Sequence, residues 1–263
     1  MRIVNYFARK NELAKKAKAH TREMSLDYSE EIDSAINRSI IYGPEMPNHT
    51  DIKKDYETVV SLNPATHQWY IENSDFGDDD IVCVHNFASY KNPGGMFIQG
   101  SSAQEESLCH ASNLYNILSG LPEFYSWNME NKNKGMYMDR AIYTPDVIFK
   151  YEDERTVTTI NIDVLTCAAP NASVMKKYGA FSKEENFAAL ERRISFVAEI
   201  LNDRKVDVFI TGAWGCGVFA QDPETVAMLM YKYLSQTCIK ELQFVIPRGH
   251  QFETFHKVLK PYL

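Results

Sequence analysis

The sequence lacks the apolar stretches that membrane insertion and secretion require. No apolar run in the 263-residue chain approaches the length of about 20 residues that crosses a bilayer. Residues 1–20 are charged throughout and contain no apolar core of a signal peptide. We therefore expect the protein to stay in the compartment where it is made, the cytoplasm, and to have no membrane partner.

Cysteine is scarce and irregularly placed. An odd number of cysteines forms no disulfide framework in a chain of this length and agrees with a reducing cytoplasm. They do not combine with the seven histidines at the spacing of metal ligands, so we expect no structural zinc. We also expect no cofactor. The five cysteines are Cys83, Cys109, Cys167, Cys216 and Cys238.

Features of nucleotide-triphosphate and nucleic-acid binding are missing as well. No Gly-Lys-Ser/Thr loop and no dinucleotide fingerprint are present. The formal charge of −7 argues against non-specific adhesion to nucleic acid, because such binding depends on Lys and Arg that neutralise phosphates. Residues 10–18 are basic, and we interpret them as a solvated helix face rather than a nucleic-acid patch.

The features that are present centre on one strand, one glycine loop and one helix start. Residues 81–87 (IVCVHNF) are nearly continuous in apolar and aromatic residues, which is typical of a strand buried on both faces. Asn92-Pro93-Gly94-Gly95 predicts a chain reversal. From residue 103 apolar residues recur at helical spacing, and the predicted helix ends near residue 120.

Two glutamates, Glu105 and Glu106, fall in the first turn of that helix, and two interpretations stay open. In one, Ser102 is the N-cap and Glu105 completes a capping box. In the other, N–H groups of the glycine loop hold an anionic or polyhydroxyl ligand, while a carboxylate performs proton chemistry on it. Both can hold together, because Glu105 can cap while Glu106 projects elsewhere. We interpret the nearby His85 and His110 as core or rim residues.

Strands and helices alternate in the rest of the chain. Residues 126–138 predict a polar surface loop. The alternation predicts a largely parallel sheet with ligands at the carboxyl ends of its strands. The predicted strands are residues 140–149 (edge or broken), 157–167, 206–210 and 242–246, and the predicted helices are 183–201, one that starts at Asp222-Pro223, and 252–258.

The first part of the chain differs in pattern from the remainder. Residues 1–77 are rich in charge, with helical patterns at 12–24 and 28–37 and a single strand-like run at 56–62. We predict that residues 1–77 form a helical extension packed on a main domain of residues 78–263.

A second glycine-rich turn comes after the predicted strand 206–210. It contains Gly212, Gly215 and Gly217 before a helix start, so that consecutive backbone N–H groups can converge on a pyrophosphate. Such turns also serve packing alone, and the pattern does not decide between the two roles. Cys216 suggests a nucleophile, but a cysteine between glycines without a histidine partner is more typical of a small filler.

Residues 86–108 (NFASYKNPGGMFIQGSSAQEESL) resemble the signature of the microbial-type poly(ADP-ribose) glycohydrolases, a branch of the macrodomain superfamily. That family pairs Asn-Phe-Ala-Ser and Asn-Pro-Gly-Gly-Gly with a later Gln-Glu-Glu. The segments YTPDV, APN and GAWGCGVF are similar to family segments at corresponding places. One departure is Met96, which stands at the third glycine of the family's triplet.

The resemblance implies a macrodomain-like three-layer α/β/α fold with a mixed, largely parallel central sheet and an N-terminal helical extension. It implies a metal-independent glycosidase that cleaves the ribose–ribose O-glycosidic bond and releases ADP-ribose. Glu106 would protonate the leaving oxygen and then activate water, while Glu105 holds ribose hydroxyls. The implied ADP-ribose-binding residues are Asn86, Phe87, Ala88, Asn92, Gly94, Gly95, Met96, Gln104, Gly215, Cys216, Gly217, Val218 and Phe219.

Two other functions stay open. Met96 alters the site near the attachment bond, which favours a hydrolase for single ADP-ribosyl groups on proteins. A macrodomain can also bind ADP-ribose without cutting it, although the two glutamates argue against a pure binding module. In each case the partner is ADP-ribose or a molecule that carries it.

Overall fold

The computed structural model describes residues 2–45, 52, 54–152 and 155–263, with side chains from residue 7 onward. A sheet of seven strands runs through it in the order β1-β4-β5-β3-β6-β7-β2. Neighbouring strands from β5 to β2 pair in parallel, whereas β4 pairs antiparallel with both β5 and β1. The strands are β1 (Ile40–Tyr42), β2 (Val59–Asn63), β3 (Val82–Phe87), β4 (Ala141–Glu152), β5 (Val157–Cys167), β6 (Val208–Thr211) and β7 (Glu241–Val245). The predicted mixed, largely parallel sheet is confirmed.

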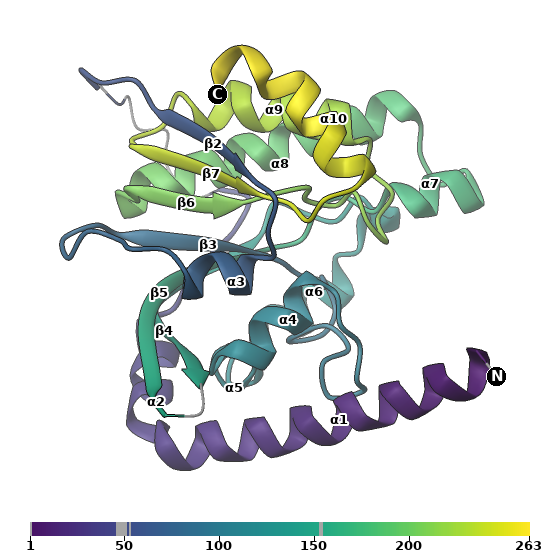
Figure 1. The fold of residues 1–263 in the computed structure, drawn as a ribbon. Coiled ribbons are helices and arrows are strands. Elements are labelled where there is room, and N and C mark those ends of the chain that lie inside the picture. The colour runs from purple at the N-terminus through teal and green to yellow at the C-terminus, as the bar shows by residue number, and fades with distance from the viewer. Residues whose placement is uncertain (1, 46–51, 53, 153–154) are drawn as a thin grey trace.

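Helices cover both faces of the sheet and complete three layers (Figure 1). One buried apolar cluster joins the sheet to α8, α9 and α10, and a second joins it to α1 through α6. The helices are α1 (Arg2–Asp27), α2 (Ser29–Arg38), α3 (His67–Glu72), α4 (Gln104–Ala111), α5 (Leu114–Ser119), α6 (Pro122–Glu130), η1 (Asn133–Gly135), α7 (Ala172–Tyr178), α8 (Lys183–Arg204), α9 (Pro223–Leu234), α10 (His250–Leu259) and η2 (Lys260–Tyr262).

Strand β3 lies in the interior of the sheet, between β5 and β6. Its residues from Val82 to Asn86 are all buried, as the continuous apolar run predicts. The carboxyl ends of the parallel strands β3, β6 and β7 therefore meet at one edge of the sheet, where the loops after them lie side by side.

The predicted helix of residues 103–120 is wrong in one respect, because it is two helices. Ser112 and Asn113 separate α4 from α5. The N–H of Asn113 donates to the carbonyl of Ile148 at 3.1 Å, and the N–H of Ile148 donates to Oδ1 of Asn113 at 3.1 Å. Because these bonds tie Asn113 to β4, they replace the continuation of the helix.

The predicted surface loop of residues 126–138 is also wrong. Helix α6 extends through Glu130, and Tyr137 is buried. The side chain of Asn128 is buried too and donates to the carbonyl of Tyr90 at 3.0 Å. Asn128 and Tyr137 are therefore held inside the protein, which composition alone does not reveal, while Ser126, Glu130 and residues 132–134 are exposed.

The first 77 residues contribute more than helices. Strand β1 pairs with β4 at one edge of the sheet, and β2 pairs with β7 at the other. The expectation of a single strand here is thus wrong. The sequence pattern did not indicate β1 because this strand is only three residues long and depends on β4 for its backbone partners. The boundary at residue 77 stays a prediction.

The remaining predicted elements appear with small shifts at their ends, except that α1 begins at Arg2 and not near residue 12. Strand β4 is broken as predicted, by a register shift between Thr144 and Val147, but it is an interior strand where β1 covers it. All five cysteines are free. No helix among the described residues is long and apolar enough to cross a membrane. The described side chains include no group of three or more His, Cys, Asp or Glu able to hold a metal ion.

Candidate active site

A pocket of about 360 Å³ opens at the carboxyl ends of β3, β6 and β7. This is the edge at which parallel α/β sheets bind ligands, and it is the edge that the strand order predicts. Four groups of residues line it. Phe87 at the end of β3 and Ala88 after it form the first group with residues 102–104 and 107–108 at α4, and Ala169 after β5 is the second. The third group is residues 213–215 and 217–219 after β6, and the fourth is residues 245–247, Gln251 and 66–68.

The loop after β6 presents free backbone donors to this pocket. The N–H groups of Gly217, Val218 and Phe219 donate no hydrogen bond to any residue that the structure describes. The loop carbonyls are engaged instead: Cys216 accepts from Nε2 of Gln251 at 3.0 Å, and Phe219 accepts from the N–H of Ser173 at 3.0 Å. Consecutive free N–H groups of this kind form a site for an anion such as a phosphate.

Gly215 lets this loop pack closely against its surroundings. Its φ is +74°, and a Cβ atom there would lie 2.8 Å from Cβ of Ala169. Gly217 has open space around it, so its role is not packing. Burial raises the pKa of the Cys216 thiol to about 12, which agrees with a filler and opposes a nucleophile.

The loop after β3 folds over the two glutamates. Gly94 and Gly95 both have φ of +61°, a conformation that residues with side chains rarely adopt. A Cβ atom at Gly95 would lie 2.6 Å from Oε1 of Glu106 and 2.9 Å from Oε2 of Glu105. The two carboxyl groups are therefore close neighbours, directly beneath the glycine loop.

Glu106 is held by two backbone donors and is only 6% exposed. Its Oε1 accepts from the N–H of Met96 at 2.9 Å, and its Oε2 accepts from the N–H of Ala103 at 2.9 Å. Ala103 is the N-cap of α4 and has no side-chain acceptor, so Glu106 caps the helix from its third position. The predicted cap of Ser102 with Glu105 is wrong, because α4 begins one residue later.

Glu105 is buried beside it, with 4% exposure. Its Oε2 accepts from the N–H of Ser89 at 2.7 Å, and its Oε1 accepts from Nδ2 of Asn86 at 3.3 Å. Burial raises the pKa of Glu105 to about 8, against the opposing effect of these hydrogen bonds, and the charge of Glu106 adds to the rise. Burial therefore favours the protonated form of Glu105.

Gln104 fixes α4 to the end of β3. Its Nε2 donates to the carbonyl of His85 at 2.7 Å, and its Oε1 accepts from the N–H of Phe87 at 2.8 Å. Gln104 lines the pocket, but its amide is engaged with the strand. The side chain of Gln104 thus hydrogen-bonds the backbone at the end of β3, and it fixes the position of the helix turn that carries the two glutamates.

The predicted site residues divide into two groups. Phe87, Ala88, Gln104, Gly215, Gly217, Val218 and Phe219 line the pocket. Asn86, Asn92, Gly94, Gly95, Met96, Glu105, Glu106 and Cys216 are not among its lining residues. Asn86 is buried and holds Glu105, whereas the side chains of Asn92 and Met96 are exposed. The φ of Met96 is not positive, so this position accepts a side chain without backbone strain.

One wall of the pocket was not anticipated from the sequence. Thr66, His67 and Gln68 approach it from the start of α3, and Pro247 and Gln251 approach from beyond β7. Burial lowers the pKa of His67 to about 4, so its ring is neutral. The turn after the strand-like run 56–62 could have predicted the part of this wall formed by residues 66–68, because a loop that comes after a parallel strand lies at the ligand-binding edge of the sheet.

An aromatic stack joins the two glycine loops. Tyr137 stacks on Tyr90 with ring centroids 4.1 Å apart. The ring of Phe219 lies beside that of Tyr137, with 6.0 Å between their centroids. Tyr90 belongs to the loop after β3, and Phe219 to the loop after β6. Tyr137 has φ of +62°, which is unusual for a bulky residue and is tolerated only where neighbours hold it.

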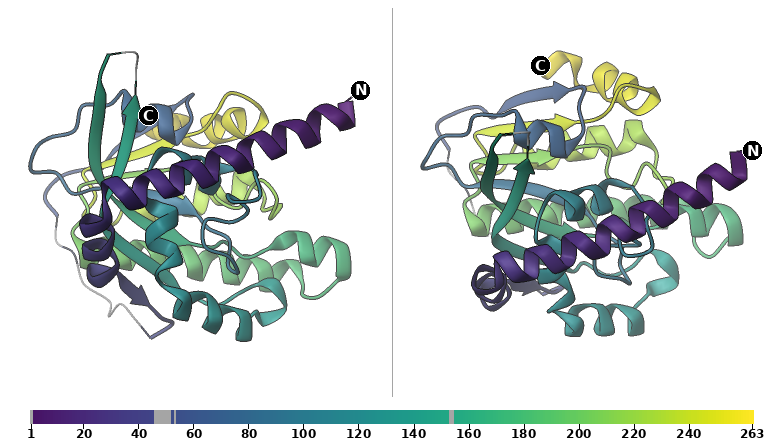
Figure 2. Two further views of the ribbon diagram at one scale, coloured as in Figure 1. Left: turned by 90° about the horizontal axis from the view of Figure 1, so that it is seen from below. Right: turned by 60° about the horizontal axis from the view of Figure 1, so that its bottom comes forward.

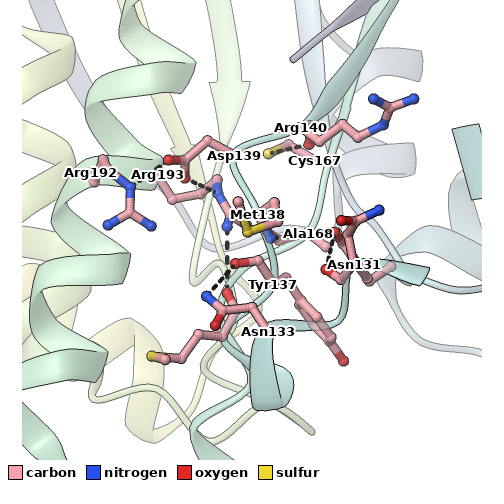
Figure 3. Close-up of polar contacts among 12 residues, drawn as sticks. Asn131, Asn133, Tyr137, Met138, Asp139, Arg140, Cys167, Ala168, Arg192 and Arg193 are labelled. Carbon is pink, nitrogen blue, oxygen red and sulfur yellow. Dashed lines mark hydrogen bonds and ion pairs between the residues drawn. The ribbon is translucent and has the colours of Figure 1, made fainter. Parts of the chain in front are cut away.

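A buried ion pair holds the segment that carries Tyr137 (Figure 3). Arg193 reaches from α8, fully buried, and its Nε donates to Asp139 at 2.6 Å. Its other nitrogens donate to the carbonyls of Ala168 and Met136 at 2.5 and 3.4 Å. Arg193 therefore joins the end of β5 to the turn beneath the aromatic stack.

A three-layer α/β/α sandwich with two glycine loops around a pocket at the carboxyl edge defines a macrodomain-like protein. The family model of the microbial-type PARG (poly(ADP-ribose) glycohydrolase) catalytic domain matches residues 10–151, more than half of the chain. The chain therefore belongs to the microbial-type PARG family and is a glycosidase of that class. None of the curated proteins matches it significantly.

Solved structures of bacterial enzymes share the fold. A poly(ADP-ribose) glycohydrolase from Thermomonospora curvata has a TM-score of 0.78 at 23% identity, covering 94% of this chain and 99% of that one. The same enzyme bound to the inhibitor ADP-HPD gives 0.77 at 24% identity, with coverage of 94% and 99%. The enzyme from Deinococcus radiodurans in complex with ADP-ribose gives 0.76 at 23%, covering 88% of this chain and 98% of that one.

Proposed function

We propose that this protein hydrolyses the ribose–ribose O-glycosidic bond at the ends of poly(ADP-ribose) and releases ADP-ribose, with Glu106 as its acid and base. The observation that carries this is the position of the Glu106 carboxylate. It is buried, it is held by Ala103 at the pocket wall, and it lies under the Gly95 loop.

The pocket offers matching groups to the rest of an ADP-ribose unit. The free N–H groups of Gly217, Val218 and Phe219 suit the pyrophosphate. Phe219, held by Tyr137, would orient the terminal ribose toward the glutamates. The adenine of ADP-ribose would then extend toward the wall formed by residues 66–68 and Pro247, because the pocket continues in that direction.

The chemistry requires a proton for the leaving oxygen and a base for water. As the bond from the anomeric carbon to oxygen breaks, the ribose becomes oxocarbenium-like and the leaving oxygen takes a proton to become a hydroxyl. Glu106 gives the leaving oxygen this proton, and the adjoining Glu105, in which burial favours the protonated form, can share its proton with Glu106. Glu106, then ionised, deprotonates the water that attacks the anomeric carbon. Glu105 would meanwhile contact ribose hydroxyls.

The test measures release and binding together. Labelled poly(ADP-ribose) and a protein carrying single ADP-ribosyl groups are each incubated with the enzyme, and free ADP-ribose is quantified while calorimetry measures its affinity. Release from the polymer supports the proposal. Release only from the singly modified protein would favour the alternative that Met96 motivates. Binding without release from either substrate would leave a binding module and overturn the proposal.

A further inference from the structure

The first helix is a cationic element in an acidic protein. Helix α1 contains seven Lys and Arg residues against three Asp and Glu, whereas the whole chain has a formal charge of −7. The acids Glu23 and Asp27 lie in the last part of the helix, beside Lys150. The positive charge therefore concentrates in its first three quarters.

Three of these cations form one ridge. Lys15, Lys18 and Arg22 are spaced by three and four residues, so they share a face of the helix. All three are exposed, whereas Ala17 and Met24 on the opposite side are fully buried. Within the described part of the chain, none of the three makes an ion pair. We call Lys15, Lys18 and Arg22 the cationic ridge.

Two segments packed against α1 carry no charge that would neutralise the ridge. Residues 96–104 and α5 contain no charged side chain. Residues 96–104 lead directly from the Gly95 loop to the start of α4 and pack closely on α1. A Cβ atom at Gly100 would lie only 2.0 Å from the carbonyl oxygen of Lys10. Asn116 of α5 secures the next turns by donating to the carbonyl of Thr21 at 2.9 Å.

The helix extends toward the side of the molecule on which the pocket opens. In Figure 1 its N-terminal part projects beyond the sheet at the edge to which the arrows of β2 and β6 point. Figure 2 shows the same projection from two further sides. The ridge lies on the later part of this helix, from near the contact of Lys10 with Gly100 to that of Thr21 with Asn116.

We propose that the cationic ridge binds phosphate groups of the polymer units that lie outside the pocket. This rests on the proposed function, because each ADP-ribose unit carries a pyrophosphate and a longer chain is a polyanion. A protein with excess negative charge repels such a chain. Three exposed cations that form no ion pair among the described residues, on a helix packed against residues 96–104, offset that repulsion. In this proposal the basic helix face of residues 10–18, which the sequence indicated to be solvated, contributes to binding the phosphate groups of the polymer.

A matched pair of double variants tests the ridge. Lys15→Glu/Lys18→Glu reverses two ridge charges, and Lys257→Glu/Lys260→Glu makes the same change at the same spacing near the far end of α10. For the ridge variant we expect KM for long polymer at low salt to rise about tenfold, and the slope of log KM against log salt to weaken by about one. Turnover number, ADP-ribose affinity and cleavage of singly modified protein should stay within twofold. The control should match the wild type.

Each result decides a different point. Equal KM for long polymer in the ridge variant and the control overturns the ridge proposal. If the wild type cleaves no polymer, the proposed function fails, and the ridge is then tested by direct binding of labelled polymer, where equal affinity of both variants overturns it. A single-stranded oligonucleotide of equal charge is the third probe. Loss of its binding in the ridge variant, with polymer KM unchanged, would assign the surface to nucleic acid and overturn the proposal.

Discussion

A side chain at Gly95 would collide with the carboxylate of Glu106, because its Cβ atom would lie 2.6 Å from Oε1. The neighbouring N–H of Met96 donates to the same oxygen. The backbone of the glycine loop and the carboxylate therefore form one unit, in which the loop holds the acid that we propose for catalysis.

Gly95→Ala should lower activity more than its backbone strain explains. Gly179→Ala is the matched control, because Gly179 has φ of +60° but nothing within 4 Å of the added Cβ atom. Both variants should lose about 1–2 kcal/mol of stability from the left-handed conformation. Only Gly95→Ala should also reduce kcat by tenfold or more, since it displaces Glu106. Equal activity of the two variants would contradict the proposed role of this contact.

Glu106→Gln should abolish turnover while retaining the ligand. The amide keeps an acceptor for one backbone N–H but cannot exchange a proton, so we expect kcat to fall by about 10²–10⁴. ADP-ribose affinity by calorimetry should change by less than about fivefold. Full activity in this variant would rule out the assignment of the acid and base.

Glu105→Gln should change the pH dependence of stability. Folding raises the pKa of Glu105 from its ordinary 4.5 to about 8. The folded protein thus keeps a proton that the unfolded chain releases in this window, so the contribution of Glu105 to stability is complete below pH 4.5 and declines as pH rises toward 8. The melting temperature of the variant relative to the wild type should therefore increase from pH 5 to pH 8.

The control for that measurement is Glu123→Gln, which changes an exposed glutamate on α6. Its melting temperature should run parallel to that of the wild type across the same range. A constant offset between Glu105→Gln and the wild type would mean that Glu105 is ionised in the folded protein at neutral pH.

Arg193→Met should destabilise the protein far more than Arg192→Met, although both arginines pair with Asp139. Arg193 is fully buried, and its loss leaves Asp139 and the carbonyl of Ala168 without that donor, which costs about 3–5 kcal/mol. Arg192 has 54% of its side chain exposed and should contribute at most about 1 kcal/mol. Chemical denaturation of both variants measures the difference in stability. Similar midpoints would contradict the greater contribution of the buried Arg193 to stability.

Met96→Gly should preserve the fold and shift the substrate preference. The side chain is 42% exposed and its φ is not positive, so glycine removes little packing and relieves no strain. If Met96 narrows the approach of the leaving group, the variant should gain several-fold in kcat/KM on polymer relative to singly modified protein. An unchanged ratio would exclude Met96 as a determinant of substrate choice.

The elements that the sequence predicted well are those specified by near neighbours. β5 spans residues 157–167 as predicted, and α9 begins at Pro223 with Asp222 as its cap. Both depend on chemistry within about four positions: alternating β-branched residues in the strand, and a side chain that accepts from the N–H of Thr225 at the cap. The glycine loops were likewise evident, because the left-handed backbone of Gly94, Gly95 and Gly215 favours glycine.

The features that the sequence did not predict depend on distant partners. The break at Asn113 requires Ile148, and the buried Tyr137 requires Tyr90 and the turn held by Arg193. Both lay in segments whose local composition indicated the opposite, a continuous helix and a surface loop.

By itself the sequence determined which residue types could do the chemistry: two adjacent carboxyls after a glycine turn, and a second glycine turn able to bind an anion. Only the tertiary structure decided what each carboxyl does in the fold. Burial under the Gly95 loop raises the pKa of Glu105 and favours its protonated form, whereas the backbone N–H groups of Met96 and Ala103 hold Glu106. The reason is that desolvation and hydrogen bonding depend on atoms brought together from separate parts of the chain, which no local pattern records.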